Sequence, residues 1–64
     1  MTVDEKVEEL KIYFKNKEEA ITYVKSEITT LKFYIEDEPS LKNIMQPNID
    51  FYKQVLKNYE STNN

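Results

Sequence analysis

The chain of 64 residues contains no cysteine, histidine, glycine, tryptophan or arginine. Without cysteine no disulfide can cross-link it, and without cysteine and histidine the common zinc sites are excluded. A β-rich fold of this size would need glycine at its turns, so the lack of glycine favours helices. Arginine dominates the recognition of phosphate and guanine, so its absence argues against nucleic-acid or phosphate binding.

Length and charge restrict the protein further. Twelve acidic residues against nine lysines give a formal net charge of −3. No apolar run approaches the roughly 20 residues of a membrane span, and the acidic N-terminus lacks the layout of a signal peptide. We therefore expect a soluble, cytoplasmic protein. A chain this short buries only about 60% of the surface that its unfolded form exposes. We expect one domain over 1–60 and a frayed tail over 61–64.

The clearest pattern is helical and centres on the middle of the chain. Its apolar residues recur at spacings of three and four, as on the buried face of a helix, namely Ile21, Val24, Ile28, Leu31 and Ile35. An earlier stripe has the same spacing and consists of Val3, Val7, Leu10 and Phe14. Thr2 and Glu5 precede it as a capping-box pattern, which marks a helix start.

The two stripes are in phase, so two arrangements are open. One helix could span 3–37, or the chain could break near Asn16, where Asn16 and Glu19 form a second capping signal. Helices of more than thirty residues are rare in small domains. We favour the break, with helices over about 3–15 and 17–37.

A third helical pattern spans about 40–60, after the acidic residues 36–38 and Pro39 have ended the second helix. Ser40 or Asp37 is expected to cap it. Its stripe comprises Leu41, Met45, Asn48, Tyr52, Val55 and Tyr59, widened by Ile44, Ile49, Phe51 and Leu56. The predicted fold class is all-α, as a small helical bundle or a helical hairpin.

Pro47 interrupts this third pattern, because proline removes a backbone hydrogen bond and clashes with the preceding turn. Either a kinked helix spans 40–60, or a short turn over 40–46 precedes a helix that begins at Pro47. Asn48 has two interpretations as well. A buried asparagine on the stripe can fix helix register, but we favour a turn residue that follows Pro47.

Reaction chemistry is not visible in the sequence, so we predict no enzyme, no cofactor and no metal site. Acidic pairs such as Glu8 and Glu9 point about 100° apart on a helix and do not converge on one substrate atom. The acidic segment 36–39 is the best candidate for a cation site, although a solvated surface is the simpler interpretation.

The aromatic and large apolar residues suggest where another protein could bind. Phe14, Tyr34, Tyr52 and Tyr59 lie on or beside the stripes, and we expect them in the core. Three residues fall on the outward side of the helix phase and form the predicted partner-binding surface, namely Ile12, Tyr23 and Phe33. The competing interpretation is that a three-helix bundle absorbs some of them into its core.

The leading functional hypothesis is a small acidic helical protein–protein interaction module that regulates or inhibits a partner protein. The amino-acid composition of the chain is rich in Lys, Asn, Ile and Glu, which is typical of proteins from AT-rich genomes. We therefore expect a bacterial, phage or mobile-element source. We also expect a homodimer, because the first stripe would lack cover if 3–37 were one helix.

One alternative is a helical-hairpin dimer that binds nucleic acid, in the manner of small plasmid RNA-binding four-helix bundles. Its candidate residues are Lys11, Lys15, Lys25 and Lys32. The other alternative is a structural subunit of a larger complex.

Overall fold

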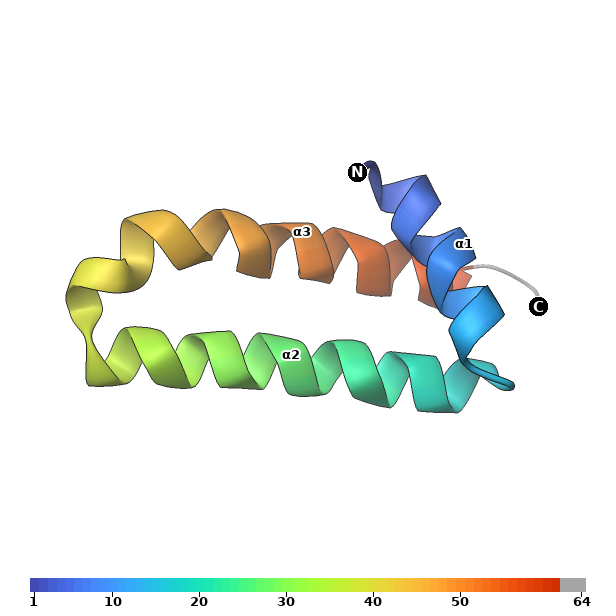
Figure 1. Ribbon diagram of the computed structural model, residues 1–64, viewed down its shortest axis with the longest axis horizontal. Coiled ribbons are helices and arrows are strands. Elements are labelled where there is room, and N and C mark those ends of the chain that lie inside the picture. The colour runs from blue at the N-terminus through green and yellow to red at the C-terminus, as the bar shows by residue number, and fades with distance from the viewer. Residues whose placement is uncertain (62–64) are drawn as a thin grey trace.

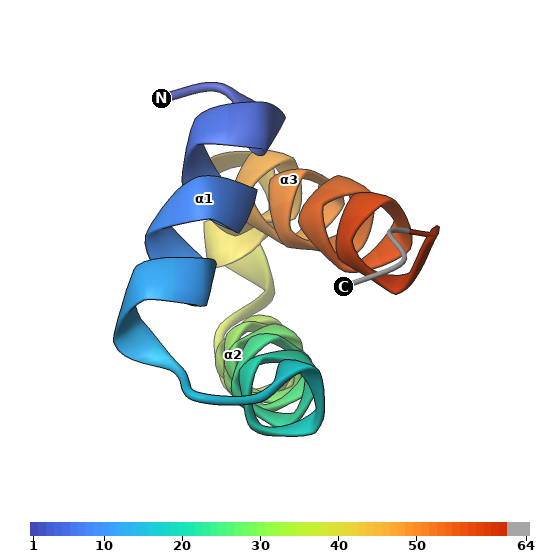
Figure 2. The same ribbon diagram turned by 90° about the vertical axis from the view of Figure 1, so that its right-hand side faces the viewer.

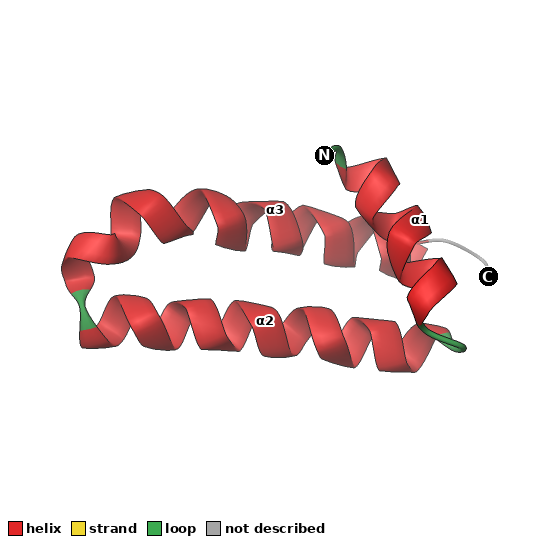
Figure 3. Ribbon diagram, viewed as in Figure 1, coloured by secondary structure: helices red, strands yellow, loops and turns green. Residues whose placement is uncertain are grey.

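The computed structural model of the protein describes residues 1–61 and contains three α-helices (Figure 1). α1 spans Val3–Tyr13, α2 spans Lys17–Asp37, and α3 spans Lys42–Ser61 after a short 3-10 helix, η1, over Pro39–Leu41. α2 and α3 run antiparallel as a hairpin, and α1 crosses this hairpin at the end where α2 begins and α3 finishes (Figures 1 and 2). Only short connections separate the helices (Figure 3). The predicted all-α class is confirmed.

The first helix begins with the predicted capping box. The Thr2 hydroxyl accepts a hydrogen bond from the Glu5 backbone N–H at 3.1 Å, and the Glu5 carboxylate accepts one from the Thr2 N–H at 2.8 Å. The hydrogen bonds from the Thr2 backbone and side chain lower the pKa of Glu5. Because the folded helix favours the ionised carboxylate, this contribution to stability is lost as the pH falls through the folded pKa.

The chain breaks between α1 and α2, as predicted, so the alternative of one helix over 3–37 is wrong. Asn16 has extended backbone angles and caps α2, since its side-chain oxygen accepts a hydrogen bond from the Glu19 N–H at 2.8 Å. The break turns α1 back across the hairpin. At the surface, Asn58 Nδ2 donates to Asp4 Oδ1 at 3.1 Å, which joins α3 to α1. Lys17 Nζ donates to the Glu60 carbonyl at 3.2 Å, which joins α2 to α3.

The connection between α2 and α3 follows the predicted position but not the predicted cap. Glu38 leaves helical geometry directly before Pro39. η1 has no side-chain cap, and the Ser40 hydroxyl instead donates to the Glu38 carboxylate at 3.1 Å.

α3 continues through Pro47 without restarting, so of the two alternatives the single helix over about 40–60 is confirmed and the helix that begins at Pro47 is wrong. Asn48 is an exposed helical residue. Both interpretations of Asn48, as a turn residue and as a buried residue, are therefore wrong. The helix ends at Ser61, one residue into the predicted tail, and the rest of that tail lies outside the described residues.

The hydrophobic core is concentrated where the three helices meet. Its buried residues are Val7, Leu10, Ala20, Val24, Ile28, Ile49, Val55 and Tyr59. α1 has 11 residues and α2 has 21, so they extend about 16 Å and about 31 Å. The radius of gyration, 12.4 Å, accordingly exceeds the value of about 10.7 Å for a compact domain of this length. The far half of the hairpin therefore consists of two helices without the third.

Candidate partner-binding surface

The three predicted site residues lie in three separate places. Ile12 on α1 is 82% exposed and Phe33 on α2 is 65% exposed, so the prediction that they face outward is confirmed. Tyr23 is only 38% exposed because its ring packs on Phe14, with the two ring centroids 5.3 Å apart. The predicted common surface depended on one continuous helical phase. The break at Asn16 separates Ile12 from the other two residues, and ten residues of α2, about 15 Å, separate Tyr23 from Phe33.

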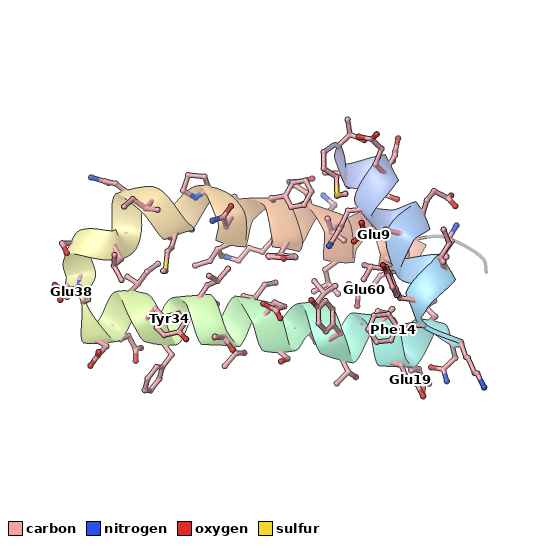
Figure 4. All side chains as sticks on the ribbon, viewed as in Figure 1. Glu9, Phe14, Glu19, Tyr34, Glu38 and Glu60 are labelled. Carbon is pink, nitrogen blue, oxygen red and sulfur yellow. The ribbon has the colours of Figure 1, made fainter. Side chains whose placement is uncertain are left out.

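The aromatic residues predicted for the core are divided in the structure. Tyr59 is buried, and Phe14 and Tyr52 are partly buried against the core. Tyr34 is 49% exposed, so its assignment to the core is wrong. The physical reason is that α1 crosses the hairpin at its other end and does not cover this part of α2. In Figure 4, Phe14 lies where α1 meets α2, and Tyr34 lies farther along α2 toward the connection to α3.

The outer side of α1 carries a first exposed patch, which we call the α1 patch. It is a shallow depression lined by Asp4, Glu5, Glu8, Glu9, Ile12 and Tyr13. Ile12 and Tyr13 supply its apolar atoms, and both are among the most exposed large side chains of the protein. Tyr13 was not among the predicted site residues, because the helical phase placed it beside the first stripe. The patch combines apolar contact area with negative charge.

A second feature is a groove along α2, here called the α2 groove. Near the start of α2 it lies between Tyr13 and Phe14 on one side and Tyr23 on the other. Farther along, a second depression lies between Glu27 and Leu31 of α2 and Phe51 of α3. Lys6 lines both depressions and lies between them, and we use the name α2 groove for the two together. The first lies beside the C-terminal end of α1, and the second lies toward the far half of the hairpin.

The middle of the α2 groove holds a cluster of ionisable groups. Lys6 Nζ lies 2.7 Å from Glu9 Oε1, and both side chains are partly buried. The hydrogen bond from Glu9 raises the pKa of Lys6. Burial raises the pKa of Tyr23, and the nearby Glu27 carboxylate adds to that increase. Both groups thus hold their protons more tightly in the folded protein than in the unfolded chain.

We expect the stability of the protein to fall at alkaline pH because of these two groups. A raised pKa means that the unfolded chain loses protons first, so the stabilisation is complete below the ordinary values of 10.0 for tyrosine and 10.5 for lysine. It is then lost as the pH rises through the folded pKa values. Urea unfolding followed by circular dichroism at pH 7, 9 and 11 measures this change.

Tyr23→Phe should reduce this alkaline loss, since it removes one of the two titrating groups. Tyr13→Phe, at an exposed tyrosine of the α1 patch, is the matched control. A pH dependence that is the same in Tyr23→Phe and in the unaltered protein would contradict the assignment to Tyr23.

Residues 1–61 contain no group of three or more His, Cys, Asp or Glu side chains placed to hold a metal ion. No helix within 1–61 is both long enough and apolar enough to cross a membrane.

The structure brings together residues that the sequence analysis did not select, above all Lys6, Glu27 and Phe51 around the α2 groove. The sequence contained a signal for the α2 side of this grouping. Glu27 and Tyr34 are seven residues apart and therefore share one side of α2. Comparison of the chain with protein-family models, with curated proteins and with solved structures found no significant match.

Proposed function

We propose that the protein is a small protein–protein interaction module that regulates or inhibits a partner protein by occupying part of its surface. The supporting observation is the set of large apolar side chains at the surface of residues 1–61. It comprises Met1, Ile12, Tyr13, Tyr23, Phe33, Tyr34 and Ile44. Single exposed apolar residues are ordinary. Seven exposed large apolar residues are many for a protein whose core contains only eight buried residues. Exposed apolar surface of this extent is typical of contact sites.

The α1 patch is the first contact surface that we assign to this function. Ile12 and Tyr13 provide apolar area, and tyrosine is a residue type enriched in protein interfaces. The surrounding carboxylates of Asp4, Glu5 and Glu8 favour a partner surface that carries lysine or arginine. Such charges increase the association rate and exclude acidic competitors.

No observation favours the alternative of a nucleic-acid-binding hairpin dimer. Its four candidate lysines come from α1, the α1–α2 connection and α2, and one of them, Lys11, pairs with Glu8 at 3.6 Å. The expectation of a homodimer rested on an uncovered first stripe. Val7 and Leu10 of that stripe are buried within the chain itself, so a dimer is not needed to cover them.

A site-specific photo-crosslinking experiment tests the proposed function. A photoreactive phenylalanine analogue replaces Ile12 in one variant and exposed Thr29 in a control variant, and both are expressed in cells of the source organism. We expect one discrete protein adduct from position 12 that is absent from position 29. Adding excess unaltered chain to the lysate before irradiation should remove it. Identical adducts from positions 12 and 29, or no adduct from position 12 and from further variants at positions 13, 23, 33 and 44, would refute an interaction module.

A further inference from the structure

The side of α3 that α1 covers continues as an exposed apolar surface beyond α1. Ile44, Phe51 and Asn58 are seven residues apart and therefore share one side of α3. Asn58 donates a hydrogen bond to Asp4 of α1, which identifies this side as the covered one. Ile44 lies fourteen residues before Asn58, about 21 Å away along the helix. At that distance α1 no longer reaches it, and Ile44 is 67% exposed.

The corresponding side of α2 shows the same change from covered to open. Tyr23 packs on Phe14, the residue that caps the end of α1, and Glu27 lies one helical turn farther along. Tyr34 follows Glu27 by seven residues, on the same side, and is exposed (Figure 4). Between the two helices, Leu31 and Phe51 line the end of the α2 groove. We call this region the open face, and define it by Leu31, Tyr34, Ile44, Asn48 and Phe51.

Two acidic side chains, Glu27 and Asp37, lie at the border of the open face, and the N-terminal residue Met1 lines the same depression as Glu27. Glu27 lines the groove at its start, and Asp37 follows Tyr23 by fourteen residues on the same side of α2. The lysine that lines this part of the groove, Lys6, is paired with Glu9.

Four of the six lysines of α2 and α3 lie on the other side, whereas Lys17 and Lys57 lie near the end of the hairpin that α1 crosses. Each of the four stands two residues from a residue on the side of the open face, which is about 200° around the helix. The pairs are Lys25 with Glu27, Lys32 with Tyr34, Lys42 with Ile44, and Lys53 with Phe51. The open face is therefore apolar with an acidic border.

α1 shows what kind of element binds to this side of the hairpin. It is an amphipathic helix of 11 residues whose Val7 and Leu10 are buried against α2 and α3. The open face lies along the hairpin beyond the crossing of α1 (Figure 1). From Glu27 to Asp37 it extends for about 15 Å along α2, which a helix of about three turns can span.

We propose that the open face binds an amphipathic helix of a partner protein, with leucine-like residues on one side and lysine or arginine along the edges of that side. The proposal rests on the proposed function and specifies the partner. Apolar residues of the bound helix would pack on Leu31, Ile44 and Phe51, and its basic residues would face Glu27 and Asp37. A second copy of the chain packed face to face would bring these acids close to their own counterparts. Nucleic acids and anionic membranes are disfavoured by the same charge.

Synthetic peptides test the proposal on the full chain. The probe is a 14-residue helical peptide with leucine on one side and lysine elsewhere. One control peptide has glutamate in place of lysine, and another has the same lysines with its leucines scrambled. Binding is followed by amide NMR shifts of the labelled protein at low salt. We expect shifts that cluster at Leu31, Tyr34, Ile44, Asn48 and Phe51. The affinity for the lysine peptide should be at least about tenfold higher than for either control and should fall with salt.

A matched pair of variants separates the open face from the α1 patch. Ile44→Lys should weaken peptide binding about tenfold, because it replaces an apolar contact by a like charge. Ile12→Lys makes the same change at an isoleucine that is also exposed, on α1, and should leave the affinity unchanged. Neither change affects a buried residue, so both variants should fold.

Several outcomes would overturn the proposal. These are shifts centred on the α1 patch, equal weakening by both variants, or equal binding of the glutamate peptide. Shifts at the open face that depend on protein concentration without any peptide would identify a second copy as the occupant. A partner crosslinked through position 12, together with no peptide binding, would leave the proposed function standing and refute this inference alone.

Discussion

Leu10→Ala is expected to lower the free energy of unfolding by about 2–5 kcal/mol. Leu10 is 2% exposed and, with Val7, forms the buried side of α1. A chain of this length has a total stability of about 3–10 kcal/mol, so the loss would take much or all of it. This loss combines the lost transfer free energy of the removed carbons with the cavity left where α1 packs on the hairpin. Urea unfolding followed by circular dichroism measures it.

The control for this prediction is Ile12→Ala, two residues along the same helix. Ile12 is exposed, and we expect its replacement to change stability by no more than about 0.5 kcal/mol. A comparable loss in both variants would mean that the outer side of α1 is covered in solution, which contradicts the structure of the single chain.

Ile49→Ala is expected to cost about 2–5 kcal/mol as well, for a different part of the core. Ile49 is 1% exposed and lies in α3, close to the point where cover by α1 ends. Its loss should weaken the packing of α3 on α2 directly. Thermal unfolding at several protein concentrations measures both the stability and any self-association.

Ile44→Ala is the matched control, with the same residue types in the same helix. Because the gain in helix propensity is the same in both variants, the difference between them reports burial alone. We expect Ile44→Ala to change stability by no more than about 0.5 kcal/mol. A large loss that depends on protein concentration would show that another copy covers the open face.

The helices themselves could be predicted because their signals are local. The capping patterns at Thr2 and Asn16 form the hydrogen bonds that they indicate, and Pro39 marks the end of α2 in both the sequence and the structure. At Pro47 the cost of a proline inside a helix left a kinked helix and a restarted helix both open. Tertiary packing overrides this local cost, since Ile49, two residues beyond Pro47, is buried.

The candidate surface could be predicted only in part. The helical phase correctly placed Ile12 and Phe33 outward. It placed Tyr34 in the core because periodicity identifies the side of a helix that faces its neighbours, without showing how far those neighbours extend. The helical phase also did not predict that Lys6 and Glu27 line the same depression. They lie on different helices, and only the packing of α1 on the hairpin brings them together.

By itself, the sequence determined the three helices, the break at Asn16, the turn at Pro39 and the absence of disulfides. These follow from spacing, capping and composition, which act within a few residues. Only the tertiary structure decided which half of the hairpin is covered, and hence that Tyr34 and Ile44 are exposed beside Glu27 and Asp37. The reason is that cover depends on the length and crossing position of α1, and these depend on contacts between residues that are far apart in the chain.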